Sequence, residues 1–155
     1  DDTTYILRRF DEMLSTNAGL VFIGASLGNE GFTAESLEPW ERDDEKVFQH
    51  YVKNMRELVT RIRMAGAEPV IGASYPNLLY DGGQYSYIKR INLLTQTWDL
   101  NTPQVNFLGT LDDGSGKWVP GFYSDVAHPN EVGQTEMYYS IVPSLFDAIL
   151  AGKPA

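Results

Sequence analysis

The sequence has no cysteine, and histidine occurs only twice in its 155 residues. Without cysteine the chain has no disulfide bonds and no thiolate metal ligands, and two histidines are too few for a histidine-based metal site. Glycine-rich phosphate-binding loops and clusters of metal-ligand residues are also missing from the sequence. We therefore expect a function that needs neither a metal ion nor an organic cofactor.

Basic residues are scarce as well. The chain has 12 lysines and arginines against 21 aspartates and glutamates, so its formal net charge is −9. This charge argues against binding to nucleic acid or to an anionic membrane surface. No apolar run approaches the roughly 20 residues of a membrane span, and residues 1–10 do not resemble a signal peptide. The sequence leaves the compartment open, with a secreted or periplasmic bacterial protein among the options.

The apolar residues alternate between helix-like and strand-like patterns along the chain. Helices are predicted over residues 3–15, 43–65, 85–100 and 131–150. Strands are predicted over Leu20–Ala25, Glu68–Ser74 and residues 104–109. The first strand is a continuous apolar run, which is typical of a strand buried on both faces, and Pro143 is expected to kink or divide the last helix. This order predicts a single α/β domain, a three-layer α/β/α sandwich with a parallel sheet and a site beyond the carboxyl ends of its strands.

One strand ends in a pattern that is typical of a nucleophilic serine. Residues 24–28 fit G-x-S-x-G around Ser26, which in α/β-hydrolases is the sharp turn that exposes the nucleophile. Residues 71–74 repeat Ile-Gly-Ala-Ser at the end of the next strand, but Tyr75 follows and the pattern fails there. This repetition favours the interpretation that Ile-Gly-Ala-Ser simply ends a buried strand with small residues. A nucleophilic Ser26 remains the alternative.

A second pattern, near the end of the chain, predicts acid–base chemistry. Asp125 and His128 lie three residues apart in "YSDVAHPNEVGQTEM", just before a predicted helix. A carboxylate at this spacing can accept the proton on one ring nitrogen of the histidine and leave the other nitrogen basic. His50, the other histidine, lies beside the apolar face of a predicted helix and is expected to be packed or solvated there.

The segment from Asp125 onward resembles the last conserved block of the SGNH (GDSL-type) esterases and lipases. In that family the aspartate and histidine complete a Ser-His-Asp triad, which implies those roles for Asp125 and His128. "LVFIGASLGNEG" resembles the block that normally reads G-x-N-D, which makes Asn29 the oxyanion-hole asparagine and puts Glu30 where aspartate is usual. Leu27 stands in place of the usual glycine, and Gly28 takes the variable position. The resemblance implies a flavodoxin-like parallel sheet and hydrolysis of carboxylic esters.

The block that carries the family's nucleophile, G-D-S-(L), has no counterpart in the sequence. The resemblance therefore implies that this chain lacks the first strands of the fold, and that the serine comes from a segment outside it. In the family's strand order, 2-1-3-4-5, the strand Leu20–Ala25 would then form an edge. We expect a second polypeptide or a second copy of the chain to pair with that edge, because natural sheet edges are seldom apolar and bare.

Several aromatic residues fall in loops on the predicted active side. They are Trp40, Tyr75, Tyr80, Trp118, Phe122 and Tyr123. Aromatic rings at such places can stack on a sugar or hold an acyl chain, although they can also cover the core. We predict substrate binding by Tyr75, Asn77, Trp118 and Tyr123, with an acetylated carbohydrate or a short-chain ester as substrate. Two alternatives remain, namely an α/β-hydrolase that uses Ser26 and a non-catalytic pseudo-hydrolase that only binds.

Overall fold

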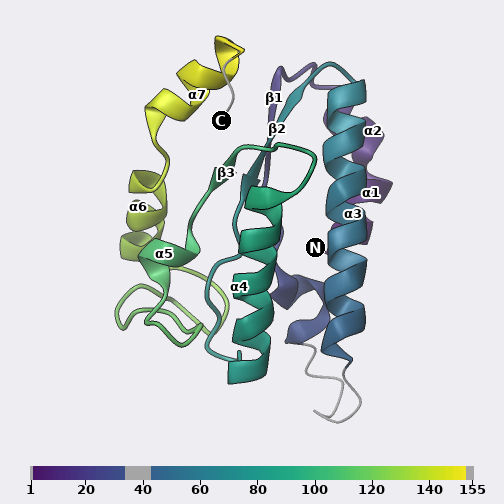
Figure 1. Ribbon diagram of the computed structural model, residues 1–155. Helices are drawn as coiled ribbons and strands as arrows, with labels where there is room; N and C mark the ends of the chain where they lie inside the picture. The colour runs from purple at the N-terminus through teal and green to yellow at the C-terminus, as the bar shows by residue number, and fades with distance from the viewer. Residues whose placement is uncertain (1, 34–42, 153–155) are drawn as a thin grey trace.

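A parallel sheet of three strands forms the centre of the molecule in the computed structural model, which describes residues 2–33 and 43–152 (Figure 1). The strands are β1 (Leu20–Ile23), β2 (Glu68–Gly72) and β3 (Gln104–Val105), in the spatial order β1-β2-β3. The predicted parallel α/β architecture is thus confirmed. Within the described residues, β1 pairs only with β2, so β1 forms one edge of the sheet.

Helices cover the two faces of the sheet unequally. One face packs on α1 (Thr3–Arg8), α2 (Phe10–Leu14), α3 (Asp44–Met64) and α4 (Gly82–Thr97). The opposite face packs on α5 (Leu108–Leu111), α6 (Glu131–Tyr139) and α7 (Pro143–Leu150). The first face holds the larger core, whereas α7 has no buried residue among Pro143–Leu150.

Several predicted elements differ in extent from the observed ones. β1 and β2 each end two residues before the predicted ends, Ala25 and Ser74. The first helix is interrupted at Arg9, whose φ and ψ of −97° and 14° separate α1 from α2. α4 begins at Gly82 and not at Tyr85, because Asp81 and Gln84 form a capping box, with the Asp81 side chain accepting from the Gln84 N–H. The third strand ends after Val105 and is followed by the short helix α5.

The division of the last helix at Pro143 is confirmed. α6 ends at Tyr139, and Pro143 occupies the first turn of α7, where its missing N–H costs no hydrogen bond.

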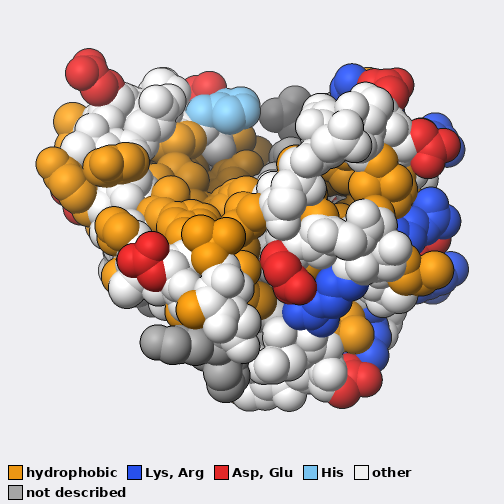
Figure 2. Space-filling model, turned by 90° about the horizontal axis from the view of Figure 1, so that it is seen from above, with side chains coloured by type: hydrophobic (Ala, Val, Ile, Leu, Met, Phe, Trp, Pro, Cys, Tyr) orange, Lys and Arg blue, Asp and Glu red, His pale blue; other side chains and the backbone are white. Residues whose placement is uncertain are grey.

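The prediction that the first strand is buried on both faces is wrong. Ile23 is buried, but Phe22, on the opposite face, keeps 38% of its surface exposed. The physical reason is that Phe22 meets the ring of Phe107 at a centroid distance of 5.9 Å, while α7 covers this face only partly. A view from above shows a hollow lined by hydrophobic side chains (Figure 2). An apolar part of the sheet therefore lies open next to its free edge.

Candidate active site

Asp125 organises the turn that leads into α6. Its Oδ1 atom accepts the N–H of Ala127 at 2.8 Å and that of His128 at 2.9 Å, and it also lies 2.9 Å from His128 Nδ1. These hydrogen bonds, first the one from Ala127 and then the one from the His128 ring, lower the pKa of Asp125. The predicted pairing of the two side chains is therefore present in the structure.

The pairing determines what the histidine ring can do. A carboxylate oxygen only accepts hydrogen bonds, so the proton of a neutral His128 ring lies on Nδ1, between the ring and Asp125. The other ring nitrogen, Nε2, has no hydrogen bond within the described part of the chain, and the His128 side chain is 71% exposed. The ring thus presents a basic nitrogen to solvent, as a general base must.

The residues that follow His128 fix the direction of the chain. Asn130 caps α6 by accepting the Gly133 N–H at 3.0 Å, and its Nδ2 donates to the Gly121 carbonyl at 2.7 Å. A Cβ atom on Gly133 would lie 2.1 Å from the carbonyl oxygen of Phe122, so only glycine fits there. This accounts physically for the spacing D-x-x-H-P-N-x-x-G.

Asn29 lies in η1 (Gly28–Phe32), one π-helical turn after β1. The side chain is exposed, and its backbone N–H lies 3.4 Å from Ser26 Oγ. The turn needs glycine at two positions: Gly31 has a φ of 135°, and a Cβ on Gly28 would lie 3.0 Å from the Tyr80 hydroxyl. The chain therefore turns sharply here and leaves Asn29 at the carboxyl end of the sheet.

Ser26 does not have the surroundings of a nucleophile elbow. Its surface is only 3% exposed, and its hydroxyl faces the main chain of its own turn. The segment that follows is the single turn η1, whereas an elbow leads directly into a packed helix.

The loop after β2 joins the Asn29 turn to the His128 turn. On one side, Tyr80 approaches Gly28. On the other side, the Leu78 N–H donates to the Val126 carbonyl at 2.9 Å, which lies between Asp125 and His128. Asn77, predicted to bind substrate, is buried inside this loop, where its Oδ1 accepts the Leu79 N–H at 2.9 Å. Both predicted functional groups thus flank one loop at the carboxyl ends of the strands.

The predicted aromatic contacts divide into buried and partly exposed rings. Trp118 is 1% exposed, stacks on Tyr75 at 5.8 Å and donates from Nε1 to the Val126 carbonyl at 3.2 Å, so it supports the His128 turn. Tyr80 is buried as well, and burial raises the pKa of its hydroxyl. Tyr75 and Tyr123 are half-buried and border the same loops. Trp40 lies outside the described residues.

A cluster of four side chains near Asn29 is missed by the sequence analysis. Glu30, in η1, bonds Thr3 of α1 and His50 of α3, and Asn54 joins them. His50 was expected to be packed or solvated, yet its Nδ1 lies 2.5 Å from Glu30 Oε1. No sequence pattern joins residues that lie 20 and 27 positions apart.

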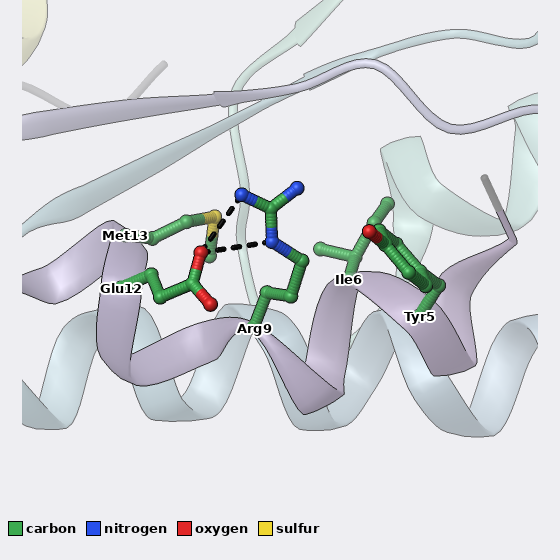
Figure 3. Close-up of a pocket in the computed structure, with 5 residues that line it drawn as sticks. All are labelled: Tyr5, Ile6, Arg9, Glu12 and Met13. Carbon is green, nitrogen blue, oxygen red and sulfur yellow. Dashed lines mark hydrogen bonds and ion pairs between the residues drawn. The ribbon is translucent and has the colours of Figure 1, made fainter.

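Other features of the described residues carry no chemistry of their own. A pocket of about 350 Å³ on α1 and α2 is lined by Tyr5, Ile6, Arg9, Glu12 and Met13 (Figure 3). Its charged groups neutralise each other, because Arg9 pairs with Glu12 at 2.8 Å. No group of three or more potential metal ligands was found among residues 2–33 and 43–152, and no helix in those ranges is long and apolar enough to cross a bilayer.

The fold is similar to that of several solved ester hydrolases. A protein named as lipolytic and of the G-D-S-L family, from Desulfitobacterium hafniense DCB-2, superposes with a TM-score of 0.68 at 18% identity, over 90% of this chain and 73% of that chain. A GDSL-like lipase from Bacteroides thetaiotaomicron VPI-5482 gives 0.73 at 15% identity, over 96% and 72%. A catalytic mutant of an acetylxylan esterase from Geobacillus stearothermophilus gives 0.65 at 13% identity, over 94% and 68%.

No family model matches the sequence, and no curated protein matches it either. The similarity to the solved structures therefore concerns the fold alone. It extends over nine-tenths or more of this chain. The chain has the α/β fold of the SGNH (GDSL-type) hydrolases.

Proposed function

We propose that this chain carries the acid–base pair and one oxyanion donor of a carboxylic-ester hydrolase. The observation that carries the proposal is the Asp125–His128 pair, in which Nδ1 is bound at 2.9 Å and Nε2 is left unbonded by the described residues. The pair lies at the carboxyl end of a parallel sheet, where sites of α/β proteins form. The similarity in fold to GDSL-type lipases and an acetylxylan esterase supports the same reaction class.

The reaction would proceed through an acyl-serine. His128 Nε2 takes the proton of a serine hydroxyl while the serine oxygen attacks the ester carbonyl, and it then gives that proton to the departing alcohol. Asp125 keeps the ring oriented and stabilises the imidazolium that forms between these steps. The Asn29 side chain would donate to the tetrahedral oxyanion, a contact worth about 3 kcal/mol in other acyl-transfer sites. Water then enters, and His128 takes its proton while the water oxygen attacks the acyl carbon. His128 returns this proton to the serine oxygen as the bond between serine and the acyl group breaks and the acid leaves.

The nucleophile would come from a separate polypeptide that adds a strand to β1. The edge of β1 is unpaired within the described residues, and Phe22 leaves apolar surface open beside it. Met13 and Val21 line a further depression of about 270 Å³ on the α2 side. A strand that paired with this edge would end near the turns of Asn29 and His128, because parallel strands share their carboxyl end. A second copy of this chain is the competing occupant.

The proposed substrate is an acetylated carbohydrate or another short-chain ester. Tyr75 and Tyr123 border the loops around His128 and are only half-buried, although one face of Tyr75 already stacks on Trp118, so part of each ring would be open to a substrate. One structural neighbour is an acetylxylan esterase. Asn77 and Trp118, buried beneath these loops, would support the site from below.

Fluorophosphonate labelling followed by intact-mass analysis, together with hydrolysis of p-nitrophenyl acetate, tests the proposal. We expect a covalent adduct on a serine of a second polypeptide that co-purifies with this chain, and loss of both adduct and hydrolysis in His128→Ala. An adduct on Ser26 would favour the α/β-hydrolase alternative. A preparation that has a bound second polypeptide but shows neither adduct nor hydrolysis would favour the pseudo-hydrolase.

A further inference from the structure

The residue after Asn29 has an environment that is unusual for an acid. The Glu30 side chain is 1% exposed, although it lies in a short turn whose preceding residue is exposed. Burial of a carboxylate is costly unless hydrogen bonds compensate for the lost water. Glu30 has three such bonds: Thr3 N–H donates to Oε2 at 2.9 Å, Thr3 Oγ1 donates to Oε1 at 2.6 Å, and His50 Nδ1 lies 2.5 Å from Oε1.

The direction of each hydrogen bond in this cluster follows from the carboxylate. The Glu30 carboxylate can only accept hydrogen bonds, so the Thr3 hydroxyl donates its proton to Glu30. The Thr3 oxygen must then accept a hydrogen bond from Asn54 Nδ2, at 2.8 Å. The same Asn54 amide nitrogen lies 3.2 Å from His50 Nε2, which therefore accepts, and the proton of the neutral ring lies on Nδ1, facing Glu30. Thr4 Oγ1 also lies 3.2 Å from Nε2.

This network restricts the turn that presents Asn29. Glu30 is joined to α1 through Thr3 and to α3 through His50, so two helices far apart in sequence hold one residue of η1. Gly31, with its φ of 135°, reverses the chain immediately afterwards. The Glu30 side chain is thus fixed in the interior, while the neighbouring Asn29 is exposed after the carboxyl end of β1. The other end of the turn is held separately, because Gln84 Nε2 donates to the Phe32 carbonyl at 2.8 Å and Phe32 is fully buried, so the network restrains the part of the turn next to Asn29.

We propose that Thr3, Glu30 and His50 are positioning residues that hold Asn29 in the orientation its oxyanion contact requires. The role of Asn29 in this inference rests on the proposed function, but the hydrogen bonds that restrain the turn are present in the chain whatever its activity. An oxyanion donor must already be placed where charge develops, since reorganisation during the reaction would cancel its benefit. Glu30, His50 and Thr3 touch no reacting atom and act only through Asn29.

Two substitutions at Thr3 separate a hydrogen-bonding role from a packing role. Thr3 is fully buried. Thr3→Val keeps the shape and loses the hydroxyl donor to Glu30, whereas Thr3→Ser keeps the donor and loses a methyl group. Thr16→Val is the matched control, because among the described residues the exposed Thr16 hydroxyl bonds only the Met13 carbonyl, at 2.8 Å. His50→Leu is a second test variant for the case that Thr3→Val fails to fold, since the His50 side chain is half-exposed.

The experiment measures backbone ¹⁵N relaxation of Asn29 in the whole chain, with kcat and KM for p-nitrophenyl acetate on the same variants bound to the second polypeptide. We expect the Asn29 order parameter to fall from about 0.85 to below about 0.6 in Thr3→Val and His50→Leu, with kcat about 10-fold lower and KM unchanged. Thr3→Ser and Thr16→Val should match the wild type. If the wild-type chain hydrolyses no ester even with the second polypeptide bound, the proposed function fails and the relaxation data alone decide. An Asn29 amide as ordered in Thr3→Val and His50→Leu as in the wild type overturns the inference, whatever the activity.

Discussion

Both histidines of the chain bind a carboxylate through Nδ1, yet the two pairs differ in almost every other respect. Asp125 and His128 are three residues apart, and their side chains are 56% and 71% exposed. Glu30 and His50 are 20 residues apart, and the Glu30 side chain is 1% exposed. The first pair is formed by one turn of the chain, while the second requires two helices and η1 to pack together.

The decisive difference lies at the other ring nitrogen. His128 Nε2 has no partner within the described residues, so it is available to a substrate or a nucleophile. His50 Nε2 faces Asn54 and Thr4 at 3.2 Å, so its hydrogen-bonding capacity is used inside the protein. Under the proposed function, the same pairing would provide a base in one place and a structural support in the other. A histidine–carboxylate pair indicates catalysis only where the second nitrogen is open.

The largest expected effect tests this contrast directly. His128→Ala should lower kcat/KM for p-nitrophenyl acetate by about 10³-fold or more, because it removes the only open histidine base. His50→Leu should lower it by no more than about 10-fold, through the position of Asn29. Steady-state kinetics of both variants, with folding checked by circular dichroism, make the comparison. Equal activity of His128→Ala and wild type, or a greater loss in His50→Leu, would refute the assignment of roles.

A smaller loss is expected at the oxyanion donor. Asn29→Ala should lower kcat by about 10²-fold and leave KM nearly unchanged, because the contact forms only when charge develops on the substrate oxygen. Asn29→Asp serves as a second variant, since it keeps the shape and loses the donor. A rise in KM at constant kcat would instead mean that Asn29 binds the ground state.

The Asp125–His128 pair could be predicted from the sequence, and the Glu30–His50 pair could not. The first depends on three consecutive peptide units and on a glycine whose absent Cβ makes room for the Phe122 carbonyl, so residue spacing carries the information. The second depends on how α1 and α3 pack against η1, and no local pattern encodes that packing. Glu30 was recognised only as standing where aspartate is usual.

The fold shows the same division between local and tertiary information. Helix and strand order, the parallel sheet and the division at Pro143 follow from apolar periodicity and proline geometry. The exposure of Phe22 could not be read from an apolar run, because a sequence does not say whether another element covers a face. The break at Arg9 and the early start of α4 depend on backbone angles and on capping by Asp81.

The Glu30–His50 pair should contribute more to the stability of the fold than the Asp125–His128 pair, although it should contribute less to catalysis. Glu30→Gln leaves buried donors with fewer acceptors, so the free energy of unfolding should fall by about 1–3 kcal/mol. Asp125→Asn alters an exposed pair, so it should lower the free energy of unfolding by less than Glu30→Gln does. Glu12→Gln, which alters the exposed pair with Arg9, is the matched control. Urea unfolding of the three variants measures the difference, and a greater loss in Asp125→Asn than in Glu30→Gln would contradict the comparison.

The smallest effect expected is the acid response of the exposed pair. Hydrogen bonds from Ala127 and His128 lower the pKa of Asp125 from its ordinary value of 3.8. A carboxyl group whose pKa is lower in the folded chain than in the unfolded chain binds fewer protons when the chain is folded. It therefore stabilises the fold fully at a pH above its pKa in the unfolded chain. This stabilisation is lost as the pH falls through its pKa in the folded chain. The Ala127 and His128 amide resonances should therefore follow a titration whose midpoint lies below pH 3.8. Asp125→Asn should show no such transition at these amides, because its side chain does not titrate. A midpoint at or above 3.8 in the wild type would mean that the turn does not hold the carboxylate as the structure indicates.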